Sequence, residues 1–177
     1  NLDSLFKLIS THVAQPSQIS KRNEPFKMLA TTLGGDSFLG RVLTGRIESG
    51  TLKTGQNLKA ISINNELIEN FRVNKILAFR GLKQQAIDTA EAGDIVSLAG
   101  MSKATVADTI ADQSVEDPIP AQPIDPPTIT VTFGINDSPL AGRDGKKVQS
   151  RVIRDRLLKE CESNVAIKMV DTPGGEA

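Results

Sequence analysis

The sequence predicts a mainly β protein, in which a closed β-barrel is followed by the first part of an α+β domain. From 26 to 114, short runs of Val, Ile, Leu and Thr are punctuated by glycines, which is typical of many strands joined by tight turns. A proline-rich stretch over 115–127 reads as a semi-rigid linker. Beyond it, a strand, a helix and a second strand follow in the order of half a split βαβ unit.

The first residues predict a short amphipathic helix over 1–13. Its apolar residues recur at helical spacing, at Leu2, Phe6, Ile9 and Val13. Residues 14–25 contain two prolines and little periodicity, so we expect a linker there. Nothing adjacent in sequence covers the apolar face of the helix, and a domain boundary is therefore expected after it.

The region from 26 to 114 favours a barrel over a sandwich. Ala60 and Ser62 alternate with Ile61 and Ile63, which is the pattern of a half-buried strand. Gly50 and Gly55 stand where turns with positive φ would let a hairpin reverse its direction.

The last region, 128–177, predicts two strands around one helix. Thr128–Ile135 alternates small or polar residues with large apolar ones, as a strand does. A helix is expected over 150–162, with Ile153, Leu157 and Cys161 on one face, and a second strand over 165–170. Because two strands and one helix are too few for independent stability, we expect this domain to be incomplete.

Composition excludes several kinds of function. Lys plus Arg equals Asp plus Glu at 21 each, so any binding to nucleic acid must be local. One cysteine and one histidine can form neither an internal disulfide nor the usual four-ligand zinc cluster. No apolar run is long enough for a membrane helix. We expect a cytoplasmic, monomeric protein with no metal site and no membrane partner.

Catalytic motifs are not found in the sequence. No segment fits the phosphate-binding pattern Gly-x-x-x-x-Gly-Lys-[Ser/Thr], and Leu77 stands where a guanine-specific Asn-Lys-x-Asp motif requires its Asp. His12 reads as a helix-terminal histidine and Cys161 as a packed thiol. We therefore expect no catalytic residue, no bound GTP or GDP and no cofactor in this chain.

Local clusters of cations are candidates for phosphate contacts. The glycine-flanked loop 142–147 precedes a predicted helix and carries three cations, an arrangement that suits an RNA phosphate or simply a solvated loop. The RNA-contact candidates are Arg72, Lys75, Arg143, Lys146, Lys147 and Arg151.

A motif over 45–55 resembles the barrel hairpin of the second domain of translational GTPases. Its characteristic positions are Gly45, Arg46, Gly50, Lys53 and Gly55, and 90–96 is similar to the last strand of that domain. The segments 25–29, 37–42, 136–142 and 150–157 are similar to the TypA/BipA branch. The resemblance covers nearly the whole chain.

This resemblance implies a domain order and a function. Residues 1–13 would be the last helix of a GTPase domain, 26–114 an elongation-factor-type closed barrel, and residues from about 124 the start of a ferredoxin-like third domain. The intact protein would hydrolyse GTP with Mg²⁺ on the ribosome, in stress adaptation or ribosome assembly. This chain would dock on small-subunit RNA and proteins, and relay the state of its own GTPase domain.

Two other hypotheses remain open from the sequence. A free-standing barrel that binds RNA or a small ligand is possible because one fold hosts many functions, although such a barrel has no use for the helix over 1–13. A flavin-binding enzyme would require convergent aromatic and polar groups, and the aromatic content of 3% argues against it.

Overall fold

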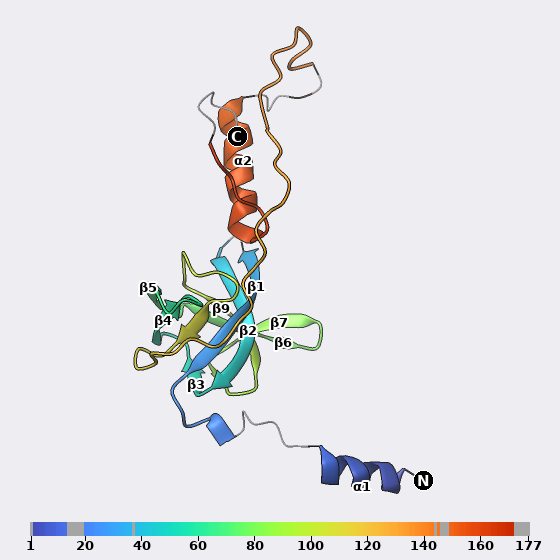
Figure 1. Cartoon of the computed structure of the whole chain (residues 1–177), viewed down its shortest axis with the longest axis vertical. Coiled ribbons are helices and arrows are strands. Elements are labelled where there is room, and N and C mark those ends of the chain that lie inside the picture. Colours follow the sequence, from blue (N-terminus) through green and yellow to red (C-terminus); the bar gives the residue numbers. More distant parts are fainter. Residues whose placement is uncertain (1, 14–19, 37, 144, 146–148, 172–177) are drawn as a thin grey trace.

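The computed structural model describes residues 2–13, 20–36, 38–143, 145 and 149–171. A β-rich unit lies in the middle, with helix α1 (Asp3–His12) at one end and helix α2 (Ser150–Ser163) at the other (Figure 1). We call the β-rich unit, residues 26–115, the β domain.

Ten strands between residues 27 and 111 make up the β domain. They are β1 (Lys27–Asp36), β2 (Gly40–Ser49), β3 (Thr51–Lys53), β4 (Asn57–Ile61), β5 (Leu67–Arg72), β6 (Lys75–Arg80), β7 (Lys83–Ile87), β8 (Thr89–Glu91), β9 (Ile95–Ala99) and β10 (Thr109–Ala111). The prediction of many short strands in this region is confirmed.

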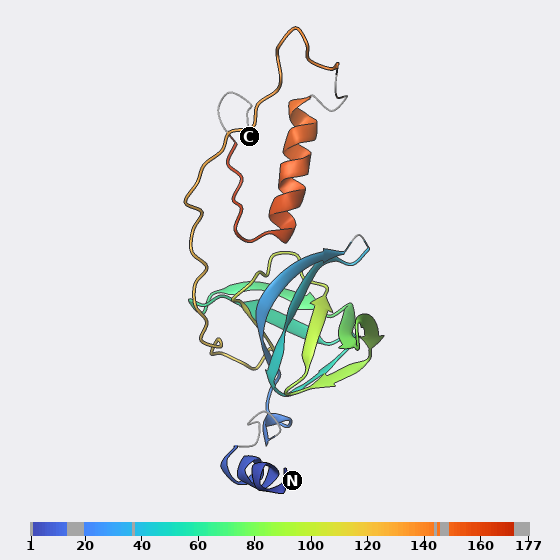
Figure 2. The ribbon, with the colours of Figure 1, turned by 90° about the vertical axis from the view of Figure 1, so that its right-hand side faces the viewer.

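Eight strands form one antiparallel sheet in the order β5-β4-β10-β1-β2-β9-β6-β7, and β3 pairs with β8. The strands curve around one another, so the sheet is bent (Figure 2). Strands β5 and β7 lie at the two ends of this order, and among the described residues no ladder joins them. The hydrogen bonds therefore leave the sheet open, and the closed barrel of the sequence analysis stays a prediction.

The core lies inside the bend of the sheet. In β3, β6 and the first half of β1, buried residues alternate with less buried ones, as a strand with one buried face requires. Strands β9 and β10 are buried at almost every position. The large side chains with no exposed surface come from seven strands, and are Met28, Leu43, Ile47, Leu52, Leu58, Ile76, Leu98 and Ile110. Burying such side chains contributes about 1.5–3 kcal/mol each, so this cluster is the main source of stability.

The predicted hairpin over 45–55 is wrong in its pairing. Strand β2 does not fold back on β3, because β3 pairs with β8 in the small sheet instead. The chain changes sheets at Gly50, which has φ of +80° and no room for a Cβ, since one would lie 2.5 Å from the Cα of Phe26. Gly50 is therefore a corner between two sheets.

Helix α1 confirms the amphipathic helix predicted over 1–13. All of its residues are exposed, including Leu5, Phe6 and Ile9 on its apolar face. It ends at His12, which is exposed, as expected for a helix-terminal histidine.

Beyond the β domain, the helix prediction holds and the strand predictions do not. Helix α2 is followed by Asn164. The predicted stripe of Ile153, Leu157 and Cys161 is half-buried, together with Val152 and Glu160. Residues 128–135 and 165–170 form no strand. A strand needs a neighbour to pair with, and no other described segment pairs with either one. The split βαβ pairing is therefore not seen among the described residues, and the ferredoxin-like third domain stays a prediction.

Candidate functional site

The predicted cations on the β domain lie at separate positions and have different surroundings. Arg72 ends β5, and its Nε donates to the carbonyl oxygen of Gly55 at 2.9 Å. Gly55 has φ of +84°, a conformation that favours glycine. The hydrogen bond from Arg72 therefore stabilises the turn at Gly55. Lys75 begins β6 near Asp36, whose pKa is lowered by the N–H groups of Leu39 and Phe38 and further by this lysine.

The other predicted cations lie outside the β domain. Arg143 is exposed in the turn after Leu140, and Arg151 on α2 is exposed and 3.8 Å from Asp155. Lys146 and Lys147 fall outside the described residues. The structure thus does not gather the described candidates into one patch.

The motif positions over 45–55 serve packing and local ion pairing in the β domain. A Cβ on Gly45 would lie 2.0 Å from the carbonyl oxygen of Leu29. Strands β1 and β2 therefore come so close here that only glycine fits. Arg46 forms an ion pair with Glu48 at 2.6 Å, and Lys53 is exposed in β3.

A basic hairpin that the sequence analysis did not single out is formed by β6 and β7. Arg80 of β6 stands directly opposite Lys83 of β7, and both side chains are exposed. Between Val73 and Ile87 the sequence holds three cations and no carboxylate. That acid-free run, in a chain of zero net charge, is the sequence signal that could have identified this hairpin.

A second ordered feature is the loop over 102–104, held on one side by the Glu69 carboxylate. That group accepts four backbone or side-chain donors from Ser102, Lys103 and Ala104, at 2.7–3.2 Å. Burial alone would raise the pKa of Glu69, but these hydrogen bonds outweigh it, and the pKa is lowered. The carboxylate therefore stays charged and fixes the loop to β5.

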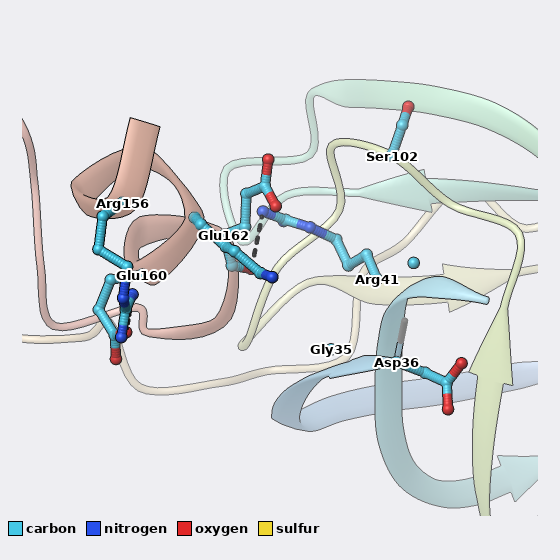
Figure 3. A pocket seen from close by; sticks show the side chains of 9 residues that line it. Gly35, Asp36, Arg41, Ser102, Arg156, Glu160 and Glu162 are labelled. Carbon is cyan, nitrogen blue, oxygen red and sulfur yellow. Dashed lines mark hydrogen bonds and ion pairs between the residues drawn. The ribbon is translucent and has the colours of Figure 1, made fainter. Parts of the chain in front are cut away.

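Arg41 holds the same loop from the other side and reaches α2. Its Nη1 donates to the carbonyl oxygens of Ala104 at 2.7 Å and Lys103 at 3.2 Å. Its Nη2 donates to the carbonyl oxygen of Glu162 at 3.4 Å (Figure 3). Because the last carbonyls of a helix have no partner within it, a cation is favourable at that end.

A cleft of about 710 Å³ lies between the β1–β2 turn, the 102–104 loop and α2. Its charged lining is mixed, with Arg41 and Lys159 set against Asp36 and Glu162, and with Arg156 paired to Glu160 at 2.7 Å. Beside the loop, burial raises the pKa of Asp108, although Thr105 donates its N–H to that carboxylate at 2.7 Å. With cations and carboxylates interleaved, the cleft shows no preference for a charged ligand.

The structure offers no catalytic or metal centre among the residues it describes. His12 and half-buried Cys161 lie on different helices, and no group of three or more His, Cys, Asp or Glu side chains gathers within the described ranges. Neither described helix is long and apolar enough to cross a membrane.

Comparison with known proteins agrees with this architecture. Residues 40–111 match the family model described as elongation factor Tu domain 2. The chain is 35% identical over its full length to the large ribosomal subunit assembly factor BipA of Bacillus subtilis. It is 38% identical over 99% of its length to the BipA of Synechocystis, and 35% identical over its full length to that of Escherichia coli K12.

Residues 40–111, most of the β domain, therefore correspond to elongation factor Tu domain 2. The similarity continues beyond that domain to both ends of the chain, through α1 and α2. The chain belongs to the TypA/BipA family. It spans 28–29% of the length of these relatives.

Proposed function

We propose that this chain is the non-catalytic, ribosome-docking and interdomain-relay portion of a BipA-like GTP-binding translation factor. The observation that carries the proposal is similarity over the whole chain to relatives named as large ribosomal subunit assembly factors. The relatives extend well beyond this chain, so GTP hydrolysis and its Mg²⁺ are assigned to a GTPase domain elsewhere in such a protein. Ribosome association would place the protein in the cytoplasm.

The same proposal supplies partners for the exposed apolar surfaces. The apolar face of α1 would pack on the GTPase domain, and residues 128–135 would pair within a ferredoxin-like third domain. The open sheet order of the β domain would close into a barrel by packing rather than by a β5–β7 ladder. Each of these surfaces carries large apolar side chains that are exposed here, such as Phe6 and Ile129.

The relay role is supported by Arg41. This one guanidinium contacts both the loop over 102–104 and the end of α2. It would thus link the β domain to a third domain that contains α2. Replacing Arg41 with Met removes those donors and keeps much of the apolar stem. We expect faster amide exchange in the last turn of α2 and in 103–105, with β9 unchanged. Unchanged exchange at both places would remove Arg41 from the relay.

Docking is tested by competition. Purified small and large ribosomal subunits are each pelleted with the labelled chain, and then with increasing amounts of the unlabelled full-length Bacillus subtilis BipA. We expect the chain to pellet with small subunits and to be displaced by the full-length protein, since both would use the same surface. Pelleting with large subunits alone would move the site to the other subunit. Pelleting without displacement would contradict shared docking.

A further inference from the structure

The tip of the β6–β7 hairpin places two like charges face to face. In the register of this pair, Arg80 is the direct partner of Lys83, across a connection of only Gly81 and Leu82. Gly81 has φ of +64°, as the first central residue of a type II′ turn requires, so the tight turn fixes this register. Like charges directly opposite each other on one sheet face are destabilising.

No described residue relieves this repulsion. Neither Arg80 nor Lys83 forms an ion pair with any residue that the structure describes, and the segment 73–87 contains no carboxylate. Lysine on an exposed edge strand is a common protection against aggregation, which would account for Lys83 on β7. It does not account for an arginine opposite it on β6. A bound anion between the two cations would remove the repulsion.

The other face of the hairpin is suited to a flat, partly apolar group. Phe79 is 55% exposed and stands opposite Gln84, on the face away from Arg80 and Lys83. On the neighbouring strand β9, Ile95 is 62% exposed and pairs with Arg46 of β2. An aromatic ring with a side-chain amide beside it can receive an unstacked base, whereas two cations receive a phosphate.

We propose that the β6–β7 hairpin is an RNA-binding finger, in which Arg80 and Lys83 together hold one backbone phosphate and Phe79 lies against a neighbouring base. This inference rests on the proposed function, because the RNA would be ribosomal RNA. A protein partner with an acidic patch would satisfy the two cations but would leave Phe79 without a role, and RNA satisfies both faces. Arg46 is less available for the same purpose, since its charge is offset by Glu48.

The test compares two variants that lose the same charge. The hairpin variant carries Arg80→Gln and Lys83→Gln, and the control carries Lys53→Gln and Lys103→Gln, two exposed lysines elsewhere on the β domain. Removing a repulsive pair should leave the melting temperature of the hairpin variant equal to or above that of the wild type. A third variant, Arg80→Lys, keeps the charge. Binding to deproteinised ribosomal RNA and to intact subunits is measured over a salt series.

Log affinity decreases with log salt, and we expect this decrease to become shallower in the hairpin variant, by about 0.7–0.9 in the magnitude of the slope, as for one lost phosphate contact. In the control and in Arg80→Lys the slope should stay unchanged. A photo-cross-linking residue in place of Leu82, which is 99% exposed, should label RNA. An unchanged slope in the hairpin variant, or cross-links to ribosomal protein alone, would overturn the finger and leave docking intact. Failure of the wild type to bind subunits would overturn the proposed function as well.

Discussion

Gly45 shows how one residue type fixes the packing of two strands. It lies in β2 opposite Ala30 of β1, beside the irregular register between Ala30 and Thr32. Any larger residue would drive its Cβ into the carbonyl oxygen of Leu29, a backbone atom that cannot move without shifting β1. The strand order alone would not reveal this requirement, because a glycine in a strand usually only weakens it.

Replacing Gly45 with Ala should therefore destabilise the β domain by about 1–3 kcal/mol, the usual range for overpacking. Gly34 is a matched control in the neighbouring strand, because its nearest atom to a new Cβ is the carbonyl oxygen of Val42 at 3.8 Å. Gly34→Ala should be neutral, or stabilising by about 0.5–1 kcal/mol. Urea unfolding of both variants measures the difference, and equal stability of the two would contradict the close approach.

Because its pKa is lowered, Glu69 should stabilise the folded chain to a degree that depends on pH. Its pKa is lower in the folded chain than in the unfolded chain, so its contribution is fully present above the ordinary glutamate pKa. The contribution is lost as the pH falls through the lowered folded value. Glu69→Gln should thus cost about 1–3 kcal/mol near pH 7, as for hydrogen bonds to a charged group.

At about pH 3, below the ordinary glutamate pKa, the wild type and Glu69→Gln should differ less, because protonation removes much of the advantage of the carboxylate. Unfolding measured by circular dichroism at both pH values tests this. A difference that stays constant with pH would show that the carboxylate does not hold the 102–104 loop through its charge.

At the scale of elements, the sequence predicted what depends on local pattern. The helices α1 and α2 follow apolar spacing, and the strand-rich region follows glycine-punctuated β-branched runs. The pairing partner of β3 depends on the corner at Gly50 and on β8, some 40 residues away in sequence, as the pair Leu52↔Ala90 shows. No local pattern encodes such a partner.

Residues 128–135 show the opposite case, a strand pattern without a strand. Ile129, Val131, Phe133 and Ile135 alternate as predicted, yet they are 47–80% exposed and pair with no described segment. We therefore expect their amides to exchange within seconds to minutes, while those of the central strand β9 are protected at the level of global unfolding. Hydrogen exchange followed by mass spectrometry measures both, and equal protection would contradict the absence of pairing at 128–135.

At the scale of the whole molecule, the position of the candidate site was only partly predictable. The balanced composition restricted nucleic-acid binding to local clusters of cations. Of the candidates, Arg72 donates to the turn at Gly55, and Arg151 lies beside Asp155. The opposed pair Arg80 and Lys83 needed the register of β6 and β7, which comes from the tight turn at Gly81. Charge counting finds basic residues, whereas strand pairing decides which of them act together.

The whole chain should bind neither GTP nor GDP. Its sequence lacks a phosphate-binding loop and the Asp of a guanine-specific motif, which are the motifs that hold a guanine nucleotide in GTPases. Calorimetric titration with each nucleotide and Mg²⁺ should give no heat of binding. Saturable binding at micromolar concentration would show that the chain carries a nucleotide site.

The most direct test of the account is sedimentation of the chain with ribosomal subunits, with and without GTP. A docking module without a nucleotide site should bind weakly, lose affinity steeply with salt, and sediment identically in GTP, in GDP and without nucleotide. The predicted result is therefore salt-dependent and nucleotide-independent association. No association at low salt, or association that changes with the nucleotide, would contradict the account.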